Sequence, residues 1–521
     1  MAQVQTPSQA THLPPIRKPV ARGRAPITST EPISSGRRVQ DLKNNCPTPL
    51  GLVRLALVAG LALSATAAAA ETQTLVILHD NDLHGHLRSY CYVETGVRST
   101  EACGVGGAAR RATLIAALRR KATAPVLVID AGDTSTRGPL ATQYEGLDEV
   151  AAMNAIGYDM AAIGNNEFKL RDALDKDDAP AAQAALHRLI TASKFPWLCA
   201  NVTDDKGQLL DGAKPFVVRK VGRLKVAFLG LTTLKSVRYS QTKDLHFQDP
   251  VEAAAVWIPK ARAEADVVIA VTHLGVDGDQ RLAHQSHGLS AIVGGDSHTF
   301  LYQELNEPDL DGKPVPVVQD GEFGADLGEL KLKFERTGDG PWTLVHSQDR
   351  LIPVNAAIAP NHRIAALVEH YAAPLDVRVG ELPDIAPDYL GRKRQTAEVL
   401  AAAWRSATGA DVGLEPEDAP YDAFRTRRVT RYQVRAILPF HEDVVTVSLT
   451  GAALQGLLAA KPRPFVGALH LTLSPEAIDP AKSYRVAMVR AVTELIGVAG
   501  AEDSGEETRD ALEHYLAQGR P

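Results

Sequence analysis

The chain has 521 residues, of which 45% are hydrophobic and 23% are charged. These are ordinary values for a globular protein, and they exclude a wholly disordered chain, a collagen-like chain and a membrane protein with many spans. The formal net charge is −6, although residues 1–70 hold eight Lys and Arg against two acids, so the remainder is more acidic still. Domains that bind nucleic acid normally carry the opposite charge, so no nucleic-acid partner is expected.

The first predicted element is an apolar run over residues 55–70, LALVAGLALSATAAAA, which follows Arg54 and ends in small residues. This pattern predicts a secretory signal peptide cleaved after Ala70, behind a polar extension rich in Pro, Ser, Thr and Arg. A start near Val53, without the extension, is the alternative. The run is too short for a membrane span, so we expect no stable membrane insertion after cleavage and a periplasmic or secreted protein.

Cysteine usage agrees with export. Three of the four cysteines follow the predicted cleavage site, namely Cys91, Cys103 and Cys199. In an oxidising compartment Cys91 and Cys103 can close a loop of about a dozen residues, which stabilises a fold by roughly 2–3 kcal/mol. We expect that disulfide. Cys199 lies in the apolar run PWLCANV and is expected to be a small buried hydrophobic residue.

From residue 74 onward, short runs of β-branched residues alternate with alanine-rich helical segments, a pattern typical of an α/β fold. The predicted strands cover residues 74–79, 125–130, 159–163, 224–230, 266–272 and 289–294. Residues 109–121 have the apolar spacing of a helix. Residues 325–352 predict antiparallel strands that close the first domain, and 361–380 predict a helix leading into a linker. Later segments, such as TAEVLAAAWRSATGADVGL and DVVTVSLTG, predict a second, α+β unit.

Polar side chains follow these strands at the point where each strand ends. They are Asp82, His84, Asp133, Asn165, His273, Asp296 and His298. Open α/β sheets bind ligands beyond the carboxyl ends of their strands. Three carboxylates, three imidazoles and one amide, with no thiolate, suit two divalent ions such as Zn²⁺, Mn²⁺ or Fe²⁺. Because two ions about 3.5–4 Å apart can clamp the attacking and leaving oxygens of a phosphoryl transfer, this set predicts hydrolysis of phosphate esters.

The motif order DxH, GD, GNxE, THxG and GxSH resembles the calcineurin-like metallophosphoesterases, and specifically the secreted 5'-nucleotidase family, over residues 72–490. The resemblance implies an α/β protein with a four-layer α/β/β/α metallophosphoesterase domain and a smaller α+β domain that binds substrate. The implied divisions are an extension with signal peptide (1–70), the metallophosphoesterase domain (71–360), a helical linker (361–380) and a degenerate substrate-binding domain (381–521).

The same resemblance implies the ligands of each metal. One ion is assigned Asp82, His84, Asp133 and His298. The other shares Asp133 and adds Asn165, His273 and Asp296. Asp296 stands where the family usually has His, and a carboxylate also binds a divalent ion. His86, in the same loop as the first ligands, is expected to have a supporting or structural role.

A first departure from the family pattern affects the catalytic dyad. The family motif reads GNHEFD, and its His and Asp stabilise the transition state and assist the leaving group. This chain reads GNNEFK, so Asn166 and Lys169 occupy those two positions. General acid help of this kind contributes about 10²–10⁴-fold, so the metal centre can persist while turnover falls. Asn166 can still donate a hydrogen bond to a phosphoryl oxygen, and Lys169 could offer positive charge.

A second departure affects the substrate-binding segment. LPFHEDVVTVSLTG resembles the family's core segment and places Phe440 at one of the two aromatic positions that sandwich the base. PEDAPY (416–421) replaces the family's Gly-rich segment, and Ala491 stands where the second aromatic belongs. Since stacking contributes about 1–3 kcal/mol per base in single-strand binders, we expect altered or weakened nucleotide specificity.

The leading hypothesis is a dimetal-dependent, 5'-nucleotidase-like hydrolase of a small-molecule phosphate ester, with a nucleotide as one candidate substrate. The alternative is a non-catalytic, metal-stabilised binding protein descended from that family, because Asn166, Lys169 and Ala491 depart from it. Hydrolysis of a sulfur-containing ester is a third candidate, to which nothing positive in the chain points. Retention of all seven ligand-type residues favours the first hypothesis.

Overall fold

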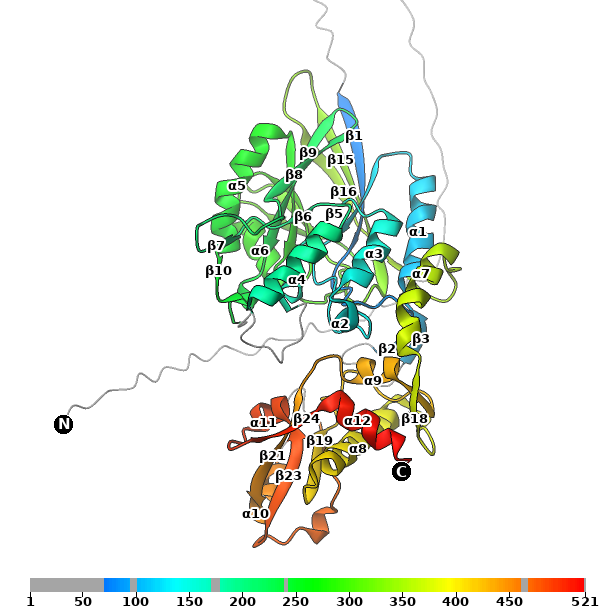
Figure 1. Ribbon diagram of the computed structural model, residues 1–521. Helices are drawn as coiled ribbons and strands as arrows, with labels where there is room; N and C mark the ends of the chain where they lie inside the picture. The colour runs from blue at the N-terminus through cyan, green and yellow to red at the C-terminus, as the bar shows by residue number, and fades with distance from the viewer. Residues whose placement is uncertain (1–69, 94–100, 170–178, 239–241, 461–466, 520–521) are drawn as a thin grey trace, which may run out of the picture. The chain divides into compact units, whose positions relative to one another are not determined.

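The computed structural model describes residues 70–93, 101–169, 179–238, 242–460 and 467–519 (Figure 1). The predicted signal peptide and the extension before it lie outside these residues. In the part of the chain that the structure describes, no helix combines the length and the apolar character needed to cross a bilayer.

The first sheet has the strand order β16-β15-β1-β4-β5-β6, with β17 paired to β15. Its strands are β1 (Glu71–Asp80), β4 (Val126–Asp130), β5 (Met160–Ala162), β6 (Trp197–Leu198), β15 (Asp326–Arg336), β16 (Thr343–Gln348) and β17 (Leu351–Pro353). The run β1-β4-β5-β6 is parallel, whereas β15 pairs antiparallel with β1 and β16. The antiparallel strands expected over residues 325–352 are therefore present and extend this sheet.

The second sheet has the order β13-β14-β12-β11-β9-β8. Its strands are β8 (Phe216–Val221), β9 (Leu224–Thr232), β11 (Val267–His273), β12 (Leu289–Val293), β13 (Leu305–Pro308) and β14 (Pro314–Val318). Strands β9, β11, β12 and β14 run parallel, so their carboxyl ends share one edge. The strands at the margins, β8 and β13, are antiparallel to their neighbours.

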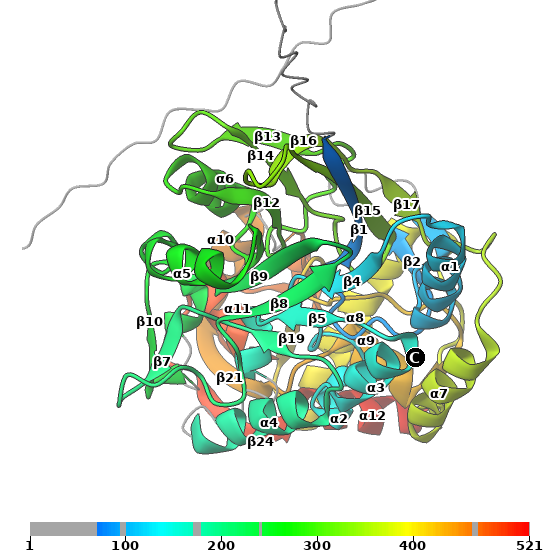
Figure 2. The ribbon, with the colours of Figure 1, turned by 90° about the horizontal axis from the view of Figure 1, so that it is seen from above.

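The two sheets pack face to face and helices cover their outer faces (Figure 2). Side chains such as Ile77, Ile129, Phe228 and Val271 fill the space between the sheets. On the first sheet lie α1 (Ala108–Lys121), α3 (Leu147–Ile156) and α4 (Ala179–Ala192); on the second lie α5 (Pro250–Glu264) and α6 (Val276–His284). Because the central strands are covered on both faces, they are apolar throughout rather than alternating. The predicted four-layer α/β/β/α arrangement is confirmed.

Shorter elements surround these layers. They are the hairpin β2 (Tyr90–Val93) with β3 (Glu101–Val105), the pair β7 (Val202–Asp204) with β10 (Leu245–Phe247), the short helix α2 (Ala141–Tyr144), and α7 (His362–Ala372). Helix α7 buries Ile364 and Val368 against α1. The helix expected to lead into a linker within 361–380 is α7, which ends at Ala372; a single 3₁₀ turn follows, since Pro374 cannot continue an α-helix.

From Arg378 onward the chain builds a different sheet, of order β22-β19-β23-β21-β24, with its own core around Trp404, Phe424 and Met488. Its strands are β19 (Val412–Pro416), β21 (Asp443–Thr450), β22 (Leu469–Leu471), β23 (Ser483–Val489) and β24 (Glu502–Glu507), beside the pair β18 (Arg378–Glu381) and β20 (Arg428–Thr430). The helices are α8 (Tyr389–Thr408), α9 (Arg431–Ile437), α10 (Gly451–Ala459), α11 (Arg490–Ile496) and α12 (Thr508–Ala517). This is the expected α+β unit.

Candidate active site

The predicted ligands come from the carboxyl ends of both sheets. In the first sheet, Asp82 and His84 follow β1, Asp133 follows β4 and Asn165 follows β5. In the second, His273 is the last residue of β11, and Asp296 and His298 follow β12. The sequence analysis placed His273 just past its strand, but the strand includes it, so its side chain is held by regular pairing with β9.

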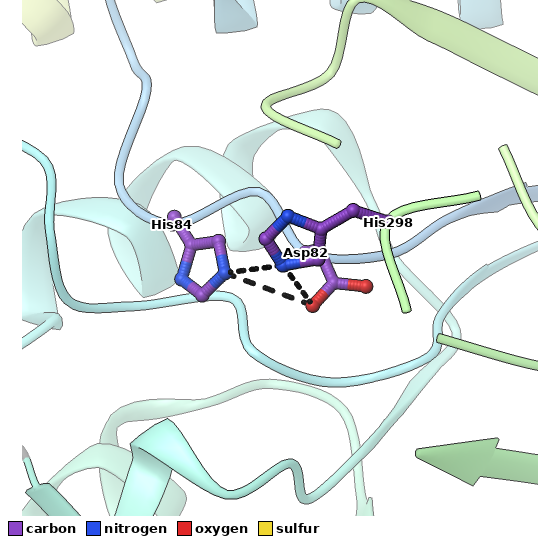
Figure 3. A group of neighbouring side chains, drawn as sticks. All are labelled: Asp82, His84 and His298. Carbon is purple, nitrogen blue, oxygen red and sulfur yellow. Dashed lines mark hydrogen bonds and ion pairs between the residues drawn. The ribbon is translucent and has the colours of Figure 1, made fainter. Parts of the chain in front are cut away.

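A first group consists of Asp82, His84 and His298, whose ligand atoms all lie within 4.8 Å of one another (Figure 3). Nε2 of His298 lies 3.2 Å from Oδ1 of Asp82, and Nε2 of His84 lies 3.6 Å from the same oxygen. The two imidazole nitrogens are 3.2 Å apart. Both rings therefore direct the same nitrogen toward one carboxylate oxygen, as ligands of a shared ion do.

A second group consists of Asp82, Asp133 and His273. Nε2 of His273 lies 3.2 Å from Oδ2 of Asp133 and 3.8 Å from Oδ1 of Asp296. The side-chain amide of Asn165 is 3.1 Å from the same Asp296 oxygen. Oδ2 of Asp133 is also 3.8 Å from Nε2 of His84 in the first group. All seven predicted ligands thus converge, with Asp133 between the two groups.

Most of these ligands sit on strained backbone. The residues with positive φ are Asp82 (51°), His84 (47°), Asp133 (55°), Asp296 (86°) and His298 (54°). Residues other than glycine adopt this region rarely, and they persist there when the surrounding structure enforces it, mostly at functional sites. The strained backbone in the loops after β1, β4 and β12 therefore orients these side chains.

The donor atoms fit divalent ions. Oδ1 of Asp82 and Nε2 of His273 are buried and make no hydrogen bond within the described structure. Nδ1 of His273 donates to the carbonyl oxygen of Ala131 at 2.9 Å, which fixes the tautomer and leaves the Nε2 lone pair available. A buried polar atom without a hydrogen bond is costly, and a metal ion bound among these nitrogen and oxygen atoms would satisfy both of them.

The charges around the imidazole nitrogens also favour a bound cation. Burial lowers the pKa of His273, but the charges of Asp133 and Asp82 outweigh it and raise that pKa well above its ordinary value. Burial likewise opposes the positive charge at His298, yet Asp82 and Glu322 raise its pKa to about 9. The carboxylates thus create a strongly negative field at the imidazole nitrogens, and this field stabilises a cation between them.

Several supporting residues were not singled out from the sequence. Glu322 accepts a hydrogen bond from Nδ1 of His298, which fixes the tautomer that leaves Nε2 free. Oδ2 of Asp82 accepts from the side-chain amide of Asn81 at 2.7 Å. Glu167 accepts from the backbone N–H of Asp133 at 3.0 Å. Glu167 is the acid of the GNxE motif and could have been identified there, whereas Glu322 has no motif.

The altered dyad positions lie directly beside the shared carboxylate. In the 3₁₀ turn η1 (Asn166–Lys169), the backbone N–H of Asn166 donates to Oδ1 of Asp133 at 2.7 Å, and its Nδ2 donates to Oδ2 at 2.5 Å. Asn166 therefore restrains Asp133. Burial lowers the pKa of Lys169 to about 8, against the opposing charge of Asp133.

A lysine compensates the carboxylate that replaces the family His. Nζ of Lys235, in the 3₁₀ turn η2 (Leu234–Arg238), lies 2.7 Å from both carboxylate oxygens of Asp296. A neutral imidazole at this position would need no counter-charge. The ion pair explains how the exchange is accommodated, and no motif predicted it.

The remaining predicted residues lie as follows. Cys91 and Cys103 are joined by a disulfide between β2 and β3, and Cys199 is buried with a free thiol. His86 stacks on Phe323 with ring centroids 4.1 Å apart, in agreement with a structural role. Phe440 is half-buried and meets Tyr421 edge to face, with centroids 5.3 Å apart. Tyr421 thus contacts the ring of Phe440 but does not lie parallel to it.

Residues 75–300 match the family described as calcineurin-like phosphoesterase, and this stretch includes all seven converging residues. Over these residues the chain is similar to the calcineurin-like phosphoesterases. Its relatives include the 5'-nucleotidase of Bos taurus, 31% identical over 328 residues that cover 59% of this chain and 54% of that protein. The silent protein UshA(0) of Salmonella typhimurium is 27% identical over 516 residues, covering 84% and 88%. The resemblance to the 5'-nucleotidase family is confirmed, although the chain spans about half the length of the vertebrate relatives.

Solved structures share the fold of this chain. A 5'-nucleotidase precursor from Thermus thermophilus has a TM-score of 0.65 at 23% identity, covering 85% of this chain and 96% of that one. The sulfate thiohydrolase SoxB of the same species has a TM-score of 0.62 at 18% identity, covering 86% and 95%. Because these two proteins are named for different reactions, the fold alone does not identify the substrate.

Proposed function

We propose that the chain is a dimetal-dependent hydrolase of small phosphate esters, related to 5'-nucleotidases but with altered or weakened nucleotide specificity. The observation that carries this proposal is the convergence of seven ligand-type side chains with buried donor atoms on Asp82 and His273 that make no hydrogen bond within the described residues. A protein that had abandoned metal binding would have little physical reason to keep such atoms unsatisfied.

In this proposal one ion is held by Asp82, His84, Asp133 and His298, and the other by Asp133, Asn165, His273 and Asp296. Divalent ions bound there would polarise a phosphoryl group and supply activated water. Within the chain, Glu322 and the Ala131 carbonyl hold the rings of His298 and His273 in their ligating tautomers. Asn166 holds the shared carboxylate and contributes a neutral amide where the family has a titrating His.

The substrate side of the proposal rests on the C-terminal unit. We assign residues 381–521 to a degenerate substrate-binding domain, residues 71–360 to the phosphoesterase domain and 361–380 to the linker. Phe440, with Tyr421 against its edge, offers one aromatic face rather than the pair of facing rings that sandwiches a base. A single face lowers discrimination among bases, so a nucleotide is one candidate among small phosphate esters. The disulfide Cys91–Cys103 and the predicted signal peptide support a periplasmic or secreted location.

The test is hydrolysis of an aryl phosphate monoester and an aryl phosphodiester with Mn²⁺, with Zn²⁺ and without metal. We expect metal-dependent turnover that Asp133→Ala abolishes together with stoichiometric metal. Asp339→Ala, at an exposed position, is the matched control and should leave both unchanged. Bound metal without any turnover would instead favour the non-catalytic binding protein, and absence of stoichiometric metal would reject both hypotheses.

A further inference from the structure

The loop after β4 carries an arginine, Arg137, beside the metal-ligand cluster. Arg137 is half-buried, and its Nε is fully buried without a hydrogen bond. Its side chain makes no hydrogen bond or ion pair with any residue that the structure describes. Arg111, by contrast, is fully buried and forms ion pairs with both Asp80 and Glu149. Burying a guanidinium nitrogen without a partner is unfavourable, and a bound anion would supply the partner that Nε lacks.

The backbone around this arginine is unusually constrained. Thr136 and Arg137 both have positive φ, 75° and 62°, although neither is glycine. The next residue, Gly138, lies so close to the loop after β1 that an added Cβ would stand 2.2 Å from the carbonyl oxygen of Gly85. The N–H groups of His84 and Gly85 in turn donate to the carbonyls of Asp133 and Thr134, at 3.0 and 2.9 Å. Thr136 and Arg137 therefore lie in a strained segment that packs against the loop carrying His84.

The charge of Arg137 reaches the cluster. Burial lowers the pKa of His84, and the positive charge of Arg137 is the next largest cause. Arg137 also adds to the lowering of the Lys169 pKa, after burial and against Asp133. Arg137 thus influences both a predicted metal ligand and the altered dyad position, in agreement with the contacts between its loop and the loop of His84. Within the described residues, no carboxylate of the cluster forms an ion pair with the guanidinium of Arg137.

We propose that Arg137 binds an oxygen of the substrate's terminal phosphoryl group beside the metal centre. The inference rests on the proposed phosphoesterase function and adds a substrate-binding residue that no motif of the sequence analysis included. A guanidinium offers planar, paired donors that match phosphoryl oxygens, and it stays charged at all working pH values. Positive charge is what this site needs, because the family's titrating His is replaced by the neutral Asn166.

The test measures binding of inorganic phosphate to the Mn²⁺-loaded full chain by calorimetry, beside metal content and aryl phosphate kinetics. Arg137→Asn removes the guanidinium, and Asn tolerates a positive φ better than most residues. We expect phosphate to bind at least tenfold more weakly, with metal content unchanged and partial recovery in Arg137→Lys. Arg120→Asn, at the exposed end of α1, is the matched control and should bind phosphate as the unmodified chain does.

The outcomes separate this inference from the proposed function. Phosphate binding that Arg137→Asn leaves unchanged, or Mn²⁺-loaded unmodified chain that binds no phosphate, would overturn the role of Arg137 even if turnover is normal. Conversely, weakened phosphate binding in Arg137→Asn would uphold that role even if the unmodified chain hydrolyses no ester. If turnover is present, Arg137→Asn should also raise KM or lower kcat/KM for the aryl phosphate by a similar factor.

Discussion

Asn166 and Asp133 are joined twice, through the backbone N–H of Asn166 to one carboxylate oxygen at 2.7 Å and through its side-chain amide to the other at 2.5 Å. The residue that replaces the family's catalytic His therefore holds a metal-ligand carboxylate. This relationship separates two properties that the family normally combines. Under the proposed function, Asn166 would support the metal centre without supplying a group that titrates near neutrality.

The first prediction concerns the dyad. The double variant Asn166→His and Lys169→Asp should raise turnover of an aryl phosphate by about tenfold or more, because it restores a group that titrates near neutrality. Steady-state kinetics at matched metal content would measure it. The single variant Lys169→Asp is the control, since it lacks the imidazole and should recover little. An unchanged rate in the double variant would mean that the enzyme uses another general acid or none.

The second prediction concerns the support of His298. Glu322→Gln should weaken binding of the ion assigned to His298 about 10–100-fold, because the amide no longer orients the imidazole as the carboxylate does. Metal titration monitored by calorimetry would measure it. Glu307 contacts His284 in a similar carboxylate–imidazole pair, 2.7 Å apart, outside the cluster. Glu307→Gln is therefore the matched control, and equal effects from both variants would count against a role for Glu322.

The third prediction concerns the disulfide. Cys91 and Cys103 are 12 residues apart, so their bond should stabilise the fold by about 2–3 kcal/mol, through restriction of the unfolded chain. Denaturant unfolding of Cys103→Ser would measure the loss. Reducing agent should destabilise the unmodified chain by the same amount and leave the variant unaffected. Identical unfolding curves with and without reductant would contradict the prediction.

The fourth prediction concerns a buried acid far along the chain from the metal ligands. Burial raises the pKa of Glu415 to about 8, despite the hydrogen bond that it accepts from Nε1 of Trp404 at 2.8 Å. The folded chain thus binds a proton that the unfolded chain releases near pH 4.5. Between these values stability should fall as pH rises, by at most about 1.4 kcal/mol per pH unit from this group.

Glu415→Gln tests this pH dependence because the amide is neutral at every pH and keeps an oxygen for Trp404. Urea unfolding between pH 5 and pH 8 should show a shallower decline of stability in the variant than in the unmodified chain. Glu476, exposed in the same unit, provides the control Glu476→Gln, which should leave the slope unchanged. Parallel curves for Glu415→Gln and the unmodified chain would exclude a buried protonated Glu415.

The strands and the ligand set were accessible from the sequence because both depend on local patterns. The central segments LVIL of β1, VLVI of β4 and VVIAV of β11 are continuous apolar runs, which follows from burial on both faces, and polar residues close after such runs mark a ligand edge. The substitutions at Asn166 and Lys169 were also evident from the sequence, because both positions belong to a family motif. The helix expected at the start of 361–380 is present as α7, and Pro374 explains why it does not extend further.

Local patterns in the sequence were thus enough to predict the layered fold, the candidate metal ligands and the departures from the family pattern. The groups that support the candidate ligands became evident only in three dimensions, because Lys235 and Glu322 contact Asp296 and His298 from segments that carry no motif. Their roles depend on distances between chain segments far apart in sequence. Charge compensation and unsatisfied burial are properties of that three-dimensional surrounding, and the order of residues along the chain does not encode them locally.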